Sequence, residues 1–360
     1  MISLIVFFFV LSVLIVVHEF GHFIAAKKSG VKVERFALGF GPKLIAHKRK
    51  GTEYAICAIP LGGYVKMAGD NLDEYKGNPD EYFSKNPGVR FNIIFFGPLL
   101  NYILGFLCFC LIFFAGYPNL TTKVGGLVDE MGAGKAGIKE NDVITAIDSK
   151  KVYYWDDLQK TVQEKKNAKS VKVYFTRDGQ AQSVDVSIQS KSFDDGLGQK
   201  RTVGLIGIIP ADEVVKVKHG LFESFYLGLK KTGEFTLMTY KALWRMVTGR
   251  LSMRESVTGP LGMFYITSKA ASLGWIAVVH VIAVLSLSLG IFNLLPMPVL
   301  DGGHIFLLAV EKIRGKSISK KLDKVFTHIG LSLIITMAVF VFFNDLVRFG
   351  IFDKVAGWIK

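Results

Sequence analysis

Four long apolar stretches divide the chain, and each is long enough to cross a lipid bilayer as a helix. They cover about residues 2–26, 91–117, 275–295 and 325–343. The first could also be a signal peptide, but Met1-Ile2-Ser3 carries no basic residue before it, which favours a span. Between the second and third stretches, residues 118–217 regain charge, glycine and alternating β-branched positions. The pattern predicts a polytopic α-helical membrane protein with one inserted α+β domain on residues 118–217.

Two shorter segments have patterns of apolar and polar residues that differ from those of the four apolar stretches. Residues 31–67 alternate as β-structure does, with a turn at Gly62-Gly63. They form either a cytoplasmic hairpin or a re-entrant sheet inside the membrane, and the pattern alone does not choose. Residues 219–250 are amphipathic and predict a helix in the membrane interface, because several lysines and Glu234 disfavour a further span. The expected organisation is an N-terminal membrane region over residues 1–117, the inserted domain, and a C-terminal membrane region over residues 218–360.

Charge sets the orientation. The formal net charge is +14, and lysine and arginine gather after the first apolar stretch and before the last. This is the bias of cytoplasmic loops in membrane proteins, so it argues against a nucleic-acid partner. Both termini and the inserted domain are then expected on the outer side. The three cysteines form neither a disulfide framework nor a zinc spacing.

Ionisable residues stand at the end of the first apolar stretch, where His18, Glu19 and His22 form the pattern H-E-x-x-H. On a helix the two histidines lie about 40° apart on one face, so both can bind one Zn²⁺. Glu19 can then take a proton from a metal-bound water. A pair of histidines ending an apolar helix is the plainer interpretation. A carboxylate inside the membrane is costly, however, and favours a functional site on the cytoplasmic side.

A third zinc ligand is predicted at Asp301 in the LDG motif, residues 300–302. It follows a helix break at Pro296 and Pro298 and falls at the depth of the two histidines. His280 lies too far along its helix to compete as a ligand, and His304 and His328 are less suitable. Asn101, in apolar surroundings, needs a partner. It could join two helices or belong to the active-site cavity.

Several motifs carry a resemblance to a known family. They are HEFGH at 18–22, GFGP at 39–42, GTEYAICAIPLGGYVKM at 51–67, GPLLN at 97–101, TGPLG at 258–262 and NLLPMPVLDGGH at 293–304. In this order they resemble the site-2 protease family of intramembrane zinc metalloproteases, in its bacterial RseP-type branch. The resemblance implies that His18, His22 and Asp301 bind zinc and that Glu19 is the catalytic base.

The resemblance also implies secondary features. Asn293 would contact the unwound substrate backbone, with Pro296 and Pro298 shaping the site. Residues 31–67 would be a membrane-re-entrant β-loop. Residues 132–144 resemble a segment of a PDZ domain, and the insert has room for one such domain. That domain could bind peptide ends or gate access sterically.

The expected function is hydrolysis of single-span membrane proteins in or near their transmembrane segments. The resemblance suggests anti-sigma factors or signal-peptide remnants as substrates, in a bacterial cytoplasmic (inner) membrane. Residues 53–59, with Tyr54, Ile56 and Ala58, are predicted as the sheet edge that pairs with unwound substrate. The alternatives are a non-proteolytic PDZ adaptor, which would not need all four site residues, and a metal transporter, which would need a polar path across the membrane.

Overall fold

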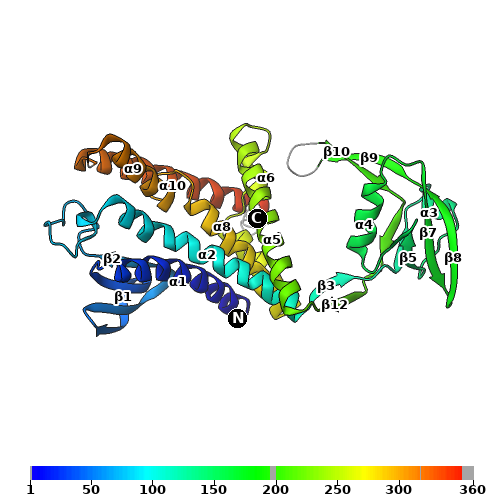
Figure 1. Ribbon diagram of the computed structural model, residues 1–360, viewed down its shortest axis with the longest axis horizontal. Coiled ribbons are helices and arrows are strands. Elements are labelled where there is room, and N and C mark those ends of the chain that lie inside the picture. The colour runs from blue at the N-terminus through cyan, green and yellow to red at the C-terminus, as the bar shows by residue number, and fades with distance from the viewer. Residues whose placement is uncertain (1, 195–199, 317, 351–360) are drawn as a thin grey trace, which may run out of the picture. The chain divides into compact units, whose positions relative to one another are not determined.

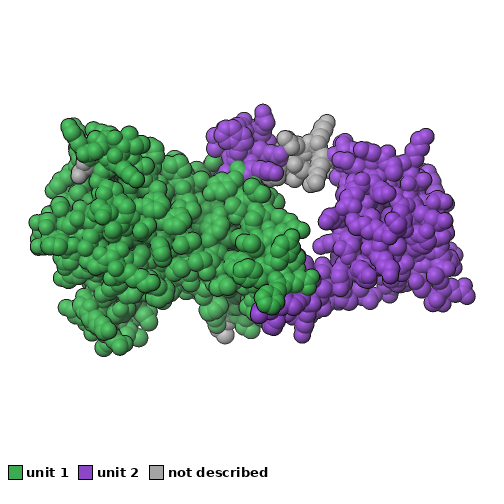
Figure 2. Space-filling model, in the orientation of Figure 1, with its two compact units in different colours: residues 1–112, 222–240, 252–360 green, residues 113–221, 241–251 purple. Residues whose placement is uncertain are grey.

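The computed structural model describes residues 2–194, 200–316 and 318–350. The chain forms two compact units (Figure 2). One contains residues 1–112, 222–240 and 252–360, and the other contains residues 113–221 and 241–251. Both termini of the chain were expected on the outer side of the membrane. Met1 and residues 351–360 lie outside the described residues.

Among the described residues, four helices are long and apolar enough to cross a membrane (Figure 1). They are α1 (Ile2–Lys28), α2 (Pro87–Ala115), α8 (Trp275–Asn293) and α10 (Lys320–Arg348). Each helix corresponds to one of the four apolar stretches that the sequence predicted. The predicted fold class, a polytopic helical membrane protein with sheets and an inserted domain, is confirmed.

Glycines bring α1 and α2 into close contact. A Cβ atom on Gly21 of α1 would overlap the Phe96 carbonyl of α2, and one on Gly97 would overlap the His22 ring. The two backbones can therefore approach in the way that small residues allow in membranes. Nearer the N-terminus of α1, Val10 and Leu14 pack against Ile282 of α8.

The N-terminal β-region is an antiparallel pair, β1 (Val33–Arg49) and β2 (Thr52–Met67). β1 bends at Gly39 and Gly41, which both have φ of +85°, so each strand contributes two segments. In space the segments pair in the order 43–49, 52–57, 35–38 and 63–67.

This order corrects one sequence prediction. The segment that holds Tyr54 and Ile56 pairs with β1 on both sides, so it is interior and its backbone cannot add a further strand. The prediction missed this because β1 folds around β2 at its glycines. The outer segments are 43–49 and 63–67.

The C-terminal region contains helices that the sequence pattern did not predict. They are α7 (Pro260–Leu273), α9 (Asp301–Arg314) and the short α6 (Met253–Ser256). The expected amphipathic helix is α5 (Leu221–Val247), and the short helix η1 (Tyr82–Ser84) precedes α2 in the N-terminal region. The fully buried carboxylate of Asp345 in α10 accepts from the backbone amides of Gly259, Leu261 and Gly262 at 3.0–3.1 Å. It satisfies amides that the start of α7 leaves unpaired.

Over the described part of residues 117–217, the inserted unit is built from short strands and the helices α3 and α4 around an apolar core. Its main sheet has the order β6-β5-β7-β8, and its core includes Ile144, Val173 and Phe175. The elements are β3 (Tyr117–Leu120), β4 (Val124–Leu127), α3 (Gly132–Lys135), β5 (Val143–Ile147), β6 (Lys150–Lys151), α4 (Trp155–Glu164), β7 (Ser170–Arg177), β8 (Gln180–Ser187), β9 (Gln189–Asp194), β10 (Lys200–Leu205), β11 (Ile208–Pro210) and β12 (Val214–Val217).

An ion pair between a buried carboxylate and a partly exposed arginine joins the start of β5 to the end of β7. Arg177 donates two hydrogen bonds of 2.7 Å to Asp142, whose side chain is 1% exposed. Burial alone would raise the pKa of Asp142, but the hydrogen bonds from Arg177 and from the Lys139 amide lower it below the usual carboxyl value. This contribution to stability is fully present above the ordinary carboxyl pKa of about 4, and it is lost as the pH falls through the lower folded-state pKa.

We expect Arg177→Met to destabilise the inserted unit by about 3 kcal/mol at neutral pH, because it leaves Asp142 buried without its partner. Amide hydrogen exchange of β5 and β7 should report the loss. The exposed pair Lys150–Glu164 supplies the control, since Lys150→Met should cost less than about 1 kcal/mol. The difference between Arg177→Met and the wild type should shrink as the pH falls below 4. An equal effect of both variants would contradict this role.

Candidate metal centre and active site

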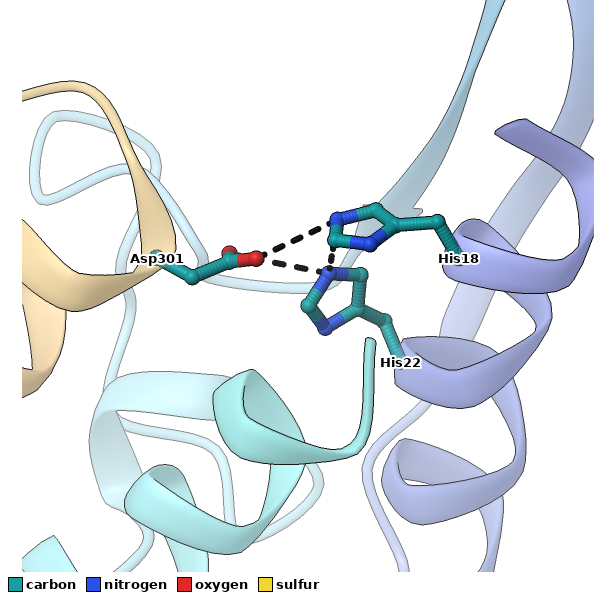
Figure 3. Close-up of side chains that lie close together, drawn as sticks. All are labelled: His18, His22 and Asp301. Carbon is teal, nitrogen blue, oxygen red and sulfur yellow. Dashed lines mark hydrogen bonds and ion pairs between the residues drawn. The ribbon is translucent and has the colours of Figure 1, made fainter. Parts of the chain in front are cut away.

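Three side chains from opposite ends of the chain converge in the membrane unit (Figure 3). His18 and His22 project from one face of α1, and Asp301 comes from the first turn of α9. The two His Nε2 atoms are 3.2 Å apart, and Asp301 Oδ2 and Oδ1 lie 3.2 Å and 3.6 Å from those of His18 and His22, respectively. All three donors lie within 4.8 Å of one another, and they are the one such set found among the described residues.

The donor set fits a small tetrahedral metal ion. Ligand atoms roughly 2.0–2.1 Å from a tetrahedral zinc lie about 3.3 Å apart, close to the 3.2 Å between the two histidine Nε2 atoms and the 3.2 Å between His18 Nε2 and Asp301 Oδ2. Asp301 Oδ2 is buried and accepts no hydrogen bond from any described residue, although His18 Nε2 is near. His22 Nδ1 lies 2.9 Å from the Ile93 carbonyl, an acceptor, so it carries the proton and leaves Nε2 free as a ligand.

Tight backbone packing places Asp301. A Cβ atom on Gly302 would overlap the Leu295 carbonyl, and one on Gly303 would overlap that of Met297. The start of α9 therefore lies directly against the segment that leaves α8. Val299 has φ of 73°, a strained conformation for a β-branched residue. At the N-terminus of α9, the helix dipole stabilises the negative charge of Asp301.

Glu19 lies beside the donor set without joining it. Its carboxylate is within reach of the Val65 backbone amide of β2, and its Cγ lies 3.5 Å from where a Cβ of Gly63 would stand. Glu19, His22 and Asp301 all line one cavity of about 350 Å³. The acid next to the first histidine therefore faces space that water can enter.

The same cavity is also lined by residues that the sequence analysis did not predict. Arg90 of α2 forms a buried ion pair with Glu311 of α9, and Tyr82 lies beside them. Arg90 also donates to the Lys85 carbonyl at 3.1 Å. The only sequence signal was an arginine at the start of an apolar stretch, because Glu311 follows 221 positions later.

The other predicted residues have different surroundings. Asn293, the last residue of α8, has its Nδ2 3.3 Å from His18 Nε2. Pro296 and Pro298 lie in the link between α8 and α9. Tyr54 packs its ring 6.0 Å from that of Phe23 on α1. Ile56 and Ala58 are exposed on β2.

Contacts show where Asn101 and the competing histidines lie. Asn101 of α2 joins α1 next to the donor set, since its Nδ2 lies 3.2 Å from His18 Nδ1. Of the three histidines weighed as competitors, His280 packs on Phe109, with ring centroids 5.8 Å apart. His328 is 2.6 Å from the Lys324 carbonyl, and His304 lines the cavity.

Comparisons with known proteins agree with this geometry. The sequence profile of Peptidase family M50 matches residues 6–337. The chain is 35% identical, over 93% of its length and 94% of the relative, to a Clostridium acetobutylicum protein whose name provisionally assigns it to the zinc metalloproteases. It is 28% identical to the regulator of sigma E protease of Haemophilus influenzae, over 95% of this chain and 98% of that one.

A likeness among solved structures is confined to one region of the chain. The PDZ domain of an SdrC-like protein from Listeria monocytogenes aligns with 25% of this chain and 86% of that domain, at 20% identity and a TM-score of 0.21. The profile match covers nearly all of the chain, and these two relatives cover 93% and 95% of it. The chain therefore belongs to peptidase family M50, the site-2 proteases that its motifs resemble.

Proposed function

We propose that this protein is a zinc-dependent intramembrane endopeptidase that cleaves single-span membrane proteins in or near their transmembrane segments. The observation that carries the proposal is the convergence of His18, His22 and Asp301 within 4.8 Å, beside Glu19 and an open cavity. His18, His22 and Asp301 would hold the ion and leave a fourth position to water or substrate. When bound, zinc would polarise the scissile carbonyl and make the water more acidic.

Glu19 would act as the general base. It lies one residue from His18, and its carboxylate faces the cavity without being a metal donor. It can take a proton from the attacking water and pass it to the leaving amine. The Val65 amide lies within reach of this carboxylate and can orient it.

A substrate helix must unwind before its peptide bond is accessible, and each freed backbone group costs several kcal/mol in lipid. The outer segment 63–67 of β2 pairs with β1 on one side only, and it lies beside Glu19. We propose that unwound substrate adds to this edge, which takes the role first predicted for residues 53–59. Asn293, at the end of α8 and 3.3 Å from His18, would bind the substrate backbone, and Pro296 and Pro298 would shape the segment around it.

The membrane orientation belongs to the same proposal. Lys27 and Lys28 end α1, and more basic residues surround the start of α10. The positive-inside bias places these ends in the cytoplasm, with the termini and inserted unit outside. The cavity is lined by Asp70, Tyr75 and Asp323 as well as the site residues. Water would therefore enter from the cytoplasmic side, in a bacterial inner membrane.

The inserted unit has a groove in which substrate peptide can bind. A groove of about 340 Å³ lies between α4 and residues 203–208, lined by apolar side chains such as Leu158, Val162 and Ile206. The Gln163 side chain bonds both the amide and the carbonyl of Gly204, as a neighbouring strand would. We propose that substrate peptide contacts this unit, and that the substrates are anti-sigma factors or signal-peptide remnants already trimmed outside.

Replacing the base tests the chemistry. Glu19→Gln should lower the cleavage rate of a model transmembrane substrate by about 10²–10⁴-fold, because the amide cannot accept the proton. Zinc content should stay unchanged, since Glu19 is not in the donor set. The control is Glu213→Gln, which alters a partly exposed ion pair with Lys123 in the inserted unit. Cleavage by Glu19→Gln at the wild-type rate would rule out this role.

Metal content tests the ligands. His18→Ala, His22→Ala and Asp301→Ala should each weaken zinc binding by more than about 100-fold, the upper range for losing a supporting hydrogen bond. His328→Ala removes an exposed histidine and should have no effect. Zinc would be measured in purified full-length protein by atomic absorption and chelator competition. Full retention in Asp301→Ala would require a different third ligand.

The close contact between α1 and α2 at Gly97 can be tested through its effect on His22. Gly97→Ala should displace His22, because the new methyl group would occupy the position of its ring. We expect zinc affinity to fall at least about tenfold while the helices still form. Gly233 of α5 has open space around it, so Gly233→Ala is the matched control. Equal zinc affinity in Gly97→Ala and the wild type would show that the ring can move aside.

A further inference from the structure

A stripe of α2 faces the two histidines of α1. Ile93, Gly97 and Asn101 are four residues apart and so lie on one face of their helix. Ile93 contacts His22 through its carbonyl, Gly97 lies against the His22 ring, and Asn101 reaches His18. Each histidine thus has its Nδ1 atom next to a polar group of α2.

The two contacts are not equivalent. A carbonyl only accepts hydrogen bonds, so Ile93 fixes His22 with its proton on Nδ1. Asn101 has both a donor and an acceptor on its amide, and a half-turn of the amide exchanges them. Its Nδ2 lies 3.2 Å from His18 Nδ1, and its Oδ1 is buried without a hydrogen-bond partner among the described residues. No other described group holds Oδ1 in its present orientation.

The orientation of Asn101 decides which nitrogen of His18 can bind metal. If Nδ2 donates to Nδ1, the proton of neutral His18 lies on Nε2, the atom 3.2 Å from Asp301 Oδ2, and metal binding is blocked. If Oδ1 accepts from Nδ1–H, Nε2 keeps its lone pair for the ion. Either arrangement leaves one polar atom of the amide without a partner among the described residues, so the lone pair that metal binding requires on His18 Nε2 is what favours the second.

We propose that Asn101 is a positioning residue that holds His18 in the Nδ1-protonated tautomer through its Oδ1 atom, as the Ile93 carbonyl does for His22. The inference rests on the proposed metal site and concerns a residue outside the donor set. The backbone of Asn101 is itself anchored, because the fully buried hydroxyl of Ser286 in α8 donates to its carbonyl at 2.8 Å. This bond holds the helix backbone and not the side-chain amide, so its loss should leave the orientation of the amide unchanged.

Three variants of the full-length protein in detergent separate the possibilities. Asn101→Leu keeps a similar volume but removes the acceptor. Asn101→Asp restores an acceptor on both side-chain oxygens, so either orientation can receive the Nδ1 proton. Ser286→Ala removes a buried hydrogen bond at the same helix interface without touching His18. Zinc affinity is measured by competition with a chelator, and the melting temperature of the metal-free protein reports folding.

We expect Asn101→Leu to weaken zinc binding by about 10–100-fold, the range found when the hydrogen-bond partner of a metal-binding histidine is lost. Asn101→Asp should bind zinc at least as tightly as the wild type. Ser286→Ala should stay within about threefold of the wild-type affinity. In protein with ¹⁵N-labelled histidine, the Nδ1-protonated signal of His18 should be present in the wild type and in Asn101→Asp and be lost in Asn101→Leu.

Wild-type affinity in Asn101→Leu would overturn the inference and leave the proposed function intact. Equal weakening in Asn101→Leu and Asn101→Asp, or in Ser286→Ala, would show that Asn101 acts only through packing and would also overturn it. A wild-type protein that binds no zinc would overturn the proposed function itself. If Asn101→Leu melts below the wild type while Asn101→Asp does not, the ¹⁵N signal of His18 in the folded fraction decides.

Discussion

The structure depends on keeping ionisable groups buried between apolar helices. An isolated carboxylate or imidazole at this depth is costly, so each must have a partner or an ion. His18, His22 and Asp301 lie close enough together to bind one metal ion, and Glu19 faces a cavity that water can enter. The close approach of α1 and α2 at their glycines and the compact link before α9 both serve this arrangement.

The backbone around the site also has tightly packed and strained positions that hold Asp301 in place. α9 begins where the chain leaves α8 through two prolines, and the glycines after Asp301 allow contact with the preceding carbonyls. The strained conformation of Val299 is retained because the surrounding contacts determine it. Functional sites commonly hold such strain, and here it lies two residues from a proposed ligand.

Polar anchors outside the site fix the helices that carry it. Arg90 and Glu311 join α2 to α9 across the cavity, and Asp345 of α10 caps the start of α7. Both carboxylates would be expensive inside an apolar bundle without these donors. The Arg90–Glu311 pair connects the N-terminal and C-terminal parts of the membrane unit, whereas Asp345 joins two helices within the C-terminal part.

Much of this architecture could be predicted from the sequence. Hydrophobic runs specify spanning helices because lipid accepts little else, and the H-E-x-x-H spacing alone puts two histidines on one helical face. The motif order was enough to indicate the family, which the comparisons confirm. Asp301 could be proposed as a partner because it was an acid at a helix break at the right depth.

Only the tertiary structure decided the rest. Folding of β1 around β2 made residues 52–57 interior and left 63–67 as the edge beside Glu19, which alternation cannot reveal because both segments alternate alike. The pairing of Arg90 with Glu311 and of Asn101 with His18 spans 221 and 83 positions. Local patterns record which face of an element is apolar, but they carry no information on which distant polar group will meet a buried one. Packing alone settles that.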